Sequence, residues 1–163
     1  LDKVLEKHLP AGYQVTGAKM ASGKMITKGY GMLSVASDYD FDTSEKNLKK
    51  VIMSQGDTLW FGELDYQSMA QEQGVDIPRC TVMFFGGPKP GGVAMKEFPK
   101  LGLDAFCQKI LLLEGPSGKV TLYYNSITAL SEFHYGKASK VHQQLDQRIT
   151  ATYNMALISS KNE

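Results

Sequence analysis

Two apolar segments joined by a short turn constrain the fold of this chain more than any other part of the sequence. Residues 109–114 (KILLLE) and 119–124 (KVTLYY) are rich in aliphatic and aromatic side chains, and the four residues GPSG lie between them. Glycine and proline in a connection of this length are typical of a hairpin turn. Strands joined in this way run antiparallel, so the sequence predicts an antiparallel sheet.

Three more segments have the character of strands that could extend this sheet. Residues 29–37 alternate apolar and polar side chains, and residues 57–64 (DTLWFGEL) contain Trp60 and Phe61. Residues 80–85 (CTVMFF) are apolar on both faces, which is typical of a strand in the interior of a sheet. We therefore expect five strands.

A helix is predicted between the first and second strands. We expect Asp42 to be its N-cap, with Glu45 as the partner in a capping box, and Gly56 to follow its last turn. Its buried face is predicted from helical spacing and comprises Leu48, Val51 and Ile52.

A second long helix is predicted near the C-terminus, at about residues 137–158. Its apolar residues recur every three or four positions, whereas His142 is expected on its solvated face. Two short helices are also expected, one capped by Asp65 and the other capped by Asn125 or Ser126.

The element order strand–helix–four strands–helix predicts an α+β fold with one antiparallel sheet that two helices cover on one face. A single domain is expected to span residues 29–163, and residues 1–28, which carry five Lys, are interpreted as an N-terminal arm. The opposite face of the sheet would carry aromatic side chains from the second and fifth strands. That face needs a partner, a ligand or the arm to cover it.

Composition excludes several classes of function. Lys and Arg number 18 and Asp and Glu number 17, so a net charge of +1 gives no field that would attract nucleic acid. No apolar run approaches the roughly 18 residues of a membrane span. The three His residues lack the spacing of a metal site, so we expect no metal and no cofactor.

The two cysteines and the first residue bear on the cellular compartment without deciding it. We predict that Cys80 and Cys107 are free thiols, since two cysteines are too few for a disulfide scaffold. The chain begins with Leu1, so we expect it to be processed or trimmed. Export with removal of a signal peptide and a cytoplasmic location both remain open.

Residues 86–92 (GGPKPGG) form the most unusual stretch and follow the predicted interior strand directly. Four glycines permit close backbone approach and positive φ, and two prolines stiffen the segment. The segment could direct backbone N–H groups and Lys89 at an anion, or it could be only a tight connection. Asp104 and His134 could line a pocket beside it, or they could serve as a turn residue and a packing residue.

Several motifs in combination resemble one bacterial family. The run FFGGPKPGGVAM, followed by LGLD, KILLLE, GKVTLYYN and LSEFHYG, is similar to the domain of unknown function 302 over about residues 30–158. The resemblance implies a TATA-binding-protein-like architecture and a tendency to dimerise, and it implies no reaction. The sequence departs from the family pattern at Gly87, where Asn is usual, at Tyr66, where His is usual, and at Cys107, near an expected Leu-Pro.

These observations lead to two hypotheses about function. The first is a homodimeric module without catalytic activity that binds a small or apolar ligand beside residues 86–92. The alternative is an enzyme that uses Asp65, Asp104, Lys89 or Cys107 in the same cleft. A nucleic-acid reader, suggested by fold analogy alone, is disfavoured by the charge. The predicted ligand-binding residues are Gly86, Gly87, Lys89, Gly91, Gly92, Tyr66, Asp104 and His134.

Overall fold

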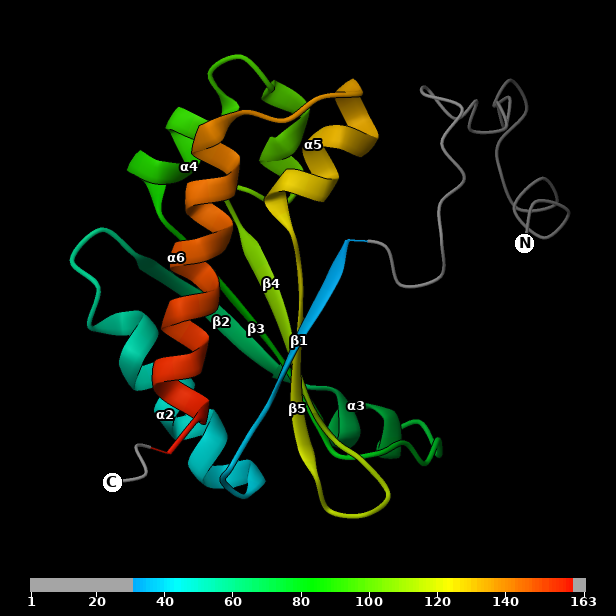
Figure 1. Cartoon of the computed structure of the whole chain (residues 1–163). Helices are drawn as coiled ribbons and strands as arrows, with labels where there is room; N and C mark the ends of the chain where they lie inside the picture. Colours follow the sequence, from blue (N-terminus) through cyan, green and yellow to red (C-terminus); the bar gives the residue numbers. More distant parts are fainter. Residues whose placement is uncertain (1–30, 160–163) are drawn as a thin grey trace, which may run out of the picture.

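The computed structural model describes residues 31–159, so the predicted N-terminal arm lies outside the described residues. Figure 1 shows the arrangement of the helices and strands. In chain order they are β1 (Met32–Ala36), α2 (Phe41–Met53), β2 (Leu59–Asp65), α3 (Tyr66–Gln71), β3 (Cys80–Gly86), α4 (Pro88–Met95), the 3-10 helix η1 (Pro99–Leu103), β4 (Gln108–Glu114), β5 (Val120–Asn125), α5 (Ile127–Tyr135) and α6 (Lys140–Leu157).

The strands form one antiparallel sheet in the order β1-β5-β4-β3-β2, which confirms the predicted fold class. β4 and β5 form the predicted hairpin, with Ile110 opposite Tyr124 and Leu112 opposite Leu122. α2 and α6 lie together on one side of the sheet, whereas α3 lies on the other side near one end (Figure 1).

The main core lies between the sheet and the two long helices. Leu48 and Ile52 of α2 are buried in it as predicted, and Val51 packs against it half-buried. Along β4, Ile110 and Leu112 are buried beneath the helices, and the residues between them face the other side. The sheet therefore has an inner face covered by helices and an outer face that, among residues 31–159, α3 covers only near one end.

The N-terminus of α2 differs from the prediction. Asp40, not Asp42, is the N-cap, and its carboxylate accepts a hydrogen bond from the backbone N–H of Thr43 at 2.8 Å. The reason is Phe41, whose side chain is buried in the main core and forms part of the first helical turn. Because Asp42 lies inside that turn, the predicted capping box with Glu45 is wrong.

The segment 86–92 is not a loop, which corrects the prediction. Its last five residues form the start of α4, with Pro88 in the first turn, where a fixed φ favours the helix. The Gly91 N–H donates to the Gly87 carbonyl oxygen at 2.7 Å. Because Pro88 and Pro90 have no N–H, this helix start offers few free backbone donors to an anion.

The glycines of this segment allow close approach rather than unusual backbone angles. None of Gly86, Gly87, Gly91 and Gly92 has a positive φ. A Cβ on Gly86 would lie 1.9 Å from the carbonyl oxygen of Phe106, and one on Gly91 would lie 3.0 Å from that of Ala105. Gly86 is therefore required by the packing of the chain that precedes β4, and Gly91 is packed tightly against the same segment.

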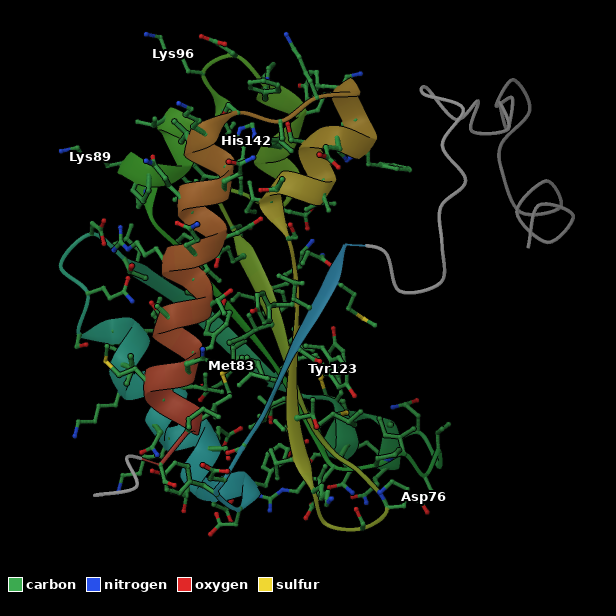
Figure 2. All side chains as sticks on the ribbon, viewed as in Figure 1. Asp76, Met83, Lys89, Lys96, Tyr123 and His142 are labelled. Carbon is green, nitrogen blue, oxygen red and sulfur yellow. The ribbon has the colours of Figure 1, made fainter. Side chains whose placement is uncertain are left out.

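A second core lies beyond one end of the sheet, among α4, η1, α5 and the first half of α6. His142 is buried there, which corrects the prediction of a solvated position. Its Nε2 lies 3.2 Å from the carbonyl oxygen of Ala94, and its ring meets that of Phe98 edge-on (Figure 2). The cause is that α6 packs against α4 and η1 as well as the sheet, so more than one side of the helix is covered.

Asp146 of α6 joins α5 to the rest of the molecule. Its carboxylate accepts hydrogen bonds from the Ser126 hydroxyl at 2.7 Å and from the N–H groups of Ile127 and Thr128 at 2.7 and 3.1 Å. It thereby satisfies donors that the start of a helix leaves free. Ser126, one of the two predicted candidates, is the N-cap of α5. Ile149, about one turn after Asp146, packs against both cores.

β2 is an edge strand that contains a β-bulge. The pairing register with β3 shifts between Trp60 and Gly62, and Gly62 has φ 147°, a region that favours glycine. Trp60 packs against the main core, whereas Phe61 is exposed.

The inner face of α2 supports a direct test of the core. Ile52→Ala should lower the free energy of unfolding by about 2–5 kcal/mol, because the truncation leaves a cavity in a close-packed region. The neighbouring Met53 is 56% exposed, so Met53→Ala should change it by less than about 0.5 kcal/mol. Urea unfolding of the two variants measures both values. A similarly small change in the free energy of unfolding of both variants would show that this face of α2 is not part of the core.

Candidate functional site

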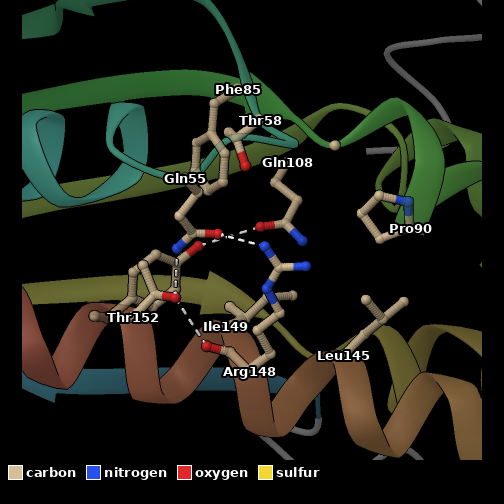
Figure 3. A pocket seen from close by; sticks show the side chains of 11 residues that line it. Gln55, Thr58, Phe85, Pro90, Gln108, Leu145, Arg148, Ile149 and Thr152 are labelled. Atoms are coloured by element: carbon tan, nitrogen blue, oxygen red, sulfur yellow. Dashed lines mark hydrogen bonds between the residues drawn. The ribbon is translucent and has the colours of Figure 1, made fainter.

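A hollow opens between α6, the start of α4 and the end of the sheet where β3 ends and β4 begins (Figure 3). We call it the inner hollow; its cavity volume is about 40 Å³, so it is narrow. The residues that line it are Gln55, Thr58, Phe85, Gly87, Pro90, Gln108, Leu145, Arg148, Ile149, Thr152 and Tyr153.

One side of the inner hollow is apolar. Phe85 lies near the end of strand β3, and Leu145 and Ile149 come from one face of α6. The Phe85 ring meets the buried Tyr153 ring edge-on, with 6.5 Å between ring centroids. Tyr153 donates a hydrogen bond to Gln108 Oε1 at 3.3 Å, and burial raises the pKa of its hydroxyl well above the usual value. That hydroxyl therefore remains protonated at neutral pH.

The other side is polar and centred on Arg148. Its Nη2 donates to Gln55 Oε1 at 2.8 Å, and Gln55 Nε2 donates to Thr152 Oγ1 at 2.8 Å (Figure 3). Arg148 also donates from Nη1 to Asp57 Oδ2 at 2.7 Å, and Nη2 contacts the other carboxylate oxygen. These bonds connect α6 to the chain between α2 and β2 across the mouth of the hollow.

A second, more open hollow continues from the first between α4 and α6. We call it the outer hollow, and the two together the α4–α6 groove. Pro90, Leu145 and Arg148 line both parts. The remaining residues of the outer hollow are Asp57, Lys89, Val93, Val141 and Gln144.

The structure places part of the predicted site at this groove. Gly87 lines the inner hollow and Lys89 the outer hollow, where its side chain extends outward from α4 (Figure 2). Gly86 and Gly91 instead pack against residues 105–106, and the space beside Gly92 is open.

The other three predicted residues lie elsewhere. Tyr66 begins α3 beside the start of β3, so it lies about 20 Å along that strand from Gly86. Asp104 pairs with Lys109 at 3.2 Å and lines a separate small hollow. His134 on α5 is half-buried against the Phe133 ring. Their roles in binding stay predictions.

The residues of the enzyme hypothesis are also dispersed. Asp65 is the N-cap of α3 and accepts from the Ser68 hydroxyl and N–H, hydrogen bonds that lower the pKa of its carboxyl. Cys80 begins β3 and Cys107 precedes β4, at opposite ends of two paired strands; both are free thiols, as predicted. Among residues 31–159 there is no group of three His, Cys, Asp or Glu that could hold a metal ion.

Sequence reasoning missed the polar side of the groove. The ion pair between Arg148 and Asp57 joins residues 91 positions apart, a contact that no local pattern indicates. One slight signal exists, because Arg148 follows Leu145 by three residues and precedes Ile149. It therefore borders the apolar face of the predicted helix.

The fold places this chain in the class of small α+β proteins with one antiparallel sheet that helices cover on one face. A family model described as "Domain of unknown function DUF302" matches residues 33–152. The chain belongs to this family.

A solved structure supports the same assignment of fold. The crystal structure of an uncharacterized conserved protein DUF302 from Bacillus stearothermophilus matches with a TM-score of 0.67 and 13% sequence identity. The match covers 77% of this chain and 98% of that chain. At this identity the likeness concerns the fold alone.

Curated relatives include proteins named "Fluoride-specific ion channel". FluC 1 of Brucella suis biovar 1 is 28% identical over 104 residues, which cover 64% of this chain and 40% of that protein. FluC 1 of Brucella abortus biovar 1 and FluC 2 of Brucella melitensis biotype 1 match with the same identity over 38% of their length. The chain thus spans about 40% of these relatives. Within its described part, none of the helices is both long and apolar enough to cross a membrane.

The ion pair at the mouth of the groove predicts a pH dependence. The hydrogen bonds from Arg148 lower the pKa of Asp57 from its ordinary value of 3.8. A lowered pKa in the folded state stabilises the protein above pH 3.8, and this stabilisation is lost as the pH falls through the lowered pKa. The difference in unfolding free energy between wild type and Asp57→Asn should therefore be present at neutral pH and shrink in acid. Urea unfolding across this pH range measures it, and a difference independent of pH would contradict it.

Proposed function

We propose that this chain is a homodimeric module without catalytic activity that binds a small, largely apolar molecule in the α4–α6 groove. The observation that carries the proposal is the composition of the inner hollow, in which an apolar wall faces a hydrogen-bonded polar side. Few polar groups, fixed in position beside apolar surface, are typical of small-molecule sites.

The groove is held in shape by the structure around it. Leu145 and Ile149 pack against the second core, and Phe85 belongs to the main core, so the apolar wall is anchored from both sides. Gln55, Arg148 and Thr152 hold one another by hydrogen bonds. A ligand would therefore order few side chains on binding, which favours affinity.

Dimerisation is proposed through the outer face of the sheet. One row of paired residues crosses all five strands on this face: Leu64, Val82, Leu111, Tyr123 and Ser34. Figure 2 shows Tyr123 on the side of the sheet away from α6, opposite to Met83. Leu64 is 40% exposed and Met32 of β1 is 54% exposed. Exposed apolar side chains on a sheet face are a feature that interfaces share, and they support the proposal.

The ligand site is tested by filling the groove. Wild type should bind Nile red, an uncharged apolar dye, and 1-octanol should displace it. Leu145→Trp should weaken dye binding by about 10-fold or more, because the larger ring occupies the space shared by both hollows. Gln147→Trp on the exposed side of the same helix is the matched control and should bind as wild type does. Unchanged dye binding by Leu145→Trp, with its melting temperature retained, would contradict the groove as the site.

The dimer is tested by placing a charge on the outer face. Leu64→Lys and Leu111→Lys should each convert a dimer into a monomer, because two buried ammonium groups would face each other across the interface. Met53→Lys, on the exposed side of α2, should leave the dimer intact. Light scattering coupled to size-exclusion chromatography measures the mass. A monomeric wild type at micromolar concentration would overturn this part of the proposal.

The Brucella relatives favour fluoride as a second candidate ligand. These proteins carry the name of a fluoride-specific ion channel, and Arg148 and Lys89 supply two cations at the groove of this chain. Calorimetric titration with sodium fluoride, with sodium chloride at equal ionic strength as the control, separates this candidate from the apolar ligand.

A further inference from the structure

We propose that the α4–α6 groove selects apolar molecules that end in a single carboxylate, and that Arg148 is the residue that binds this carboxylate. The inference rests on the proposed binding function and specifies the class of ligand.

The charges around the groove give it a preference for one negative charge. Arg148 is the one charged side chain among the residues that line the inner hollow. The outer hollow adds Lys89 and Asp57. Two cations and one carboxylate leave a local excess of one positive charge, which a monoanionic ligand would neutralise.

Arg148 has donors to spare for such a ligand. A guanidinium carries five N–H groups. Three hydrogen bonds from Arg148 go to Asp57 and Gln55. One N–H group on Nε and one on Nη1 remain, on a side chain that is 44% exposed, and either can donate a single hydrogen bond to a ligand.

Asp57 shows which kind of anion Arg148 binds, and its own negative charge limits the charge that a ligand can carry. Its carboxylate binds both terminal nitrogens of the guanidinium, the geometry that suits a planar carboxylate. A second carboxylate can share the guanidinium, and Lys89 lies close enough to Asp57 to influence the pKa of its carboxyl. A dianionic phosphate would exceed the local excess of one positive charge, and Asp57 would repel it more strongly than a monoanionic carboxylate.

The apolar wall defines the rest of the ligand. Leu145 borders both hollows beside Arg148, and Ile149 and Phe85 continue the apolar surface into the inner hollow. A molecule with its carboxylate at Arg148 can therefore lay an aliphatic chain along this wall. Burial of the chain supplies affinity, and the carboxylate supplies selectivity.

The experiment compares octanoate, 1-octanol and octyl phosphate as competitors of Nile red on the full chain. Wild type should bind octanoate about 10-fold or more tightly than 1-octanol, the preference expected of a charge-assisted hydrogen bond. Arg148→Gln should abolish this preference. Asp57→Asn should increase it several-fold, because the competing internal carboxylate is removed. The preference should also fall as salt is raised, because screening weakens the contact between the charges.

A matched control is present at the other end of the molecule. Arg79 pairs with Asp42 and its side chain is 40% exposed, much as Arg148 is, so Arg79→Gln removes a similar ion pair outside the groove. This variant should keep the wild-type preference for octanoate.

The outcomes separate this inference from the proposed function. Binding of 1-octanol and octanoate with equal affinity, tighter binding of octyl phosphate, or an Arg148→Gln variant that keeps the preference would overturn the carboxylate inference alone. Failure of both octanoate and 1-octanol to displace the dye from a folded wild type would overturn the binding function and this inference together.

Discussion

The packing of α6 against two cores at once is the constraint on which the rest of the molecule depends. Its C-terminal half covers the sheet through Tyr153 and Leu157, and its N-terminal half covers α4 and η1 through His142. Ile149 lies where the two cores meet and packs against both. The groove forms between α4 and α6 because the single helix α6 spans two separate cores. Its geometry therefore depends on how firmly each end of α6 is held.

Much of the fold could be predicted from the sequence because its signals are local. The hairpin of β4 and β5 follows from two apolar runs and a turn of glycine and proline, and the alternation along each strand gives the face that it buries. α4 was not predicted because its glycine and proline content is typical of a loop. The glycine at position 86 is required by the carbonyl oxygen of Phe106, a neighbour twenty residues along the chain that no local pattern reveals. His142 was misplaced because a helix covered on two sides lacks a single apolar stripe.

Two residues that the sequence singled out, Gly87 and Lys89, line the candidate groove. The unusual composition of their segment indicated a place where chain elements meet closely, and a role in binding stays a prediction. Arg148 and Asp57 come from helix and loop positions that look like ordinary solvated residues in the sequence. Only the folded chain brings them together, and a pair so far apart in sequence has no signature in composition or spacing. Tyr66 is the opposite case: it was proposed as a ligand-binding residue because it departs from the family pattern, but it lies far from the groove.

The bulge at Gly62 has a consequence for how copies of this chain meet one another. An edge strand with regular spacing offers its free backbone groups to any other strand, which is the first step toward fibrils. The register shift in β2 interrupts that regular spacing. The geometry of β2 therefore opposes growth by strand addition at this edge. Within residues 31–159, the sheet can therefore end at β2 without a further strand to cover that edge.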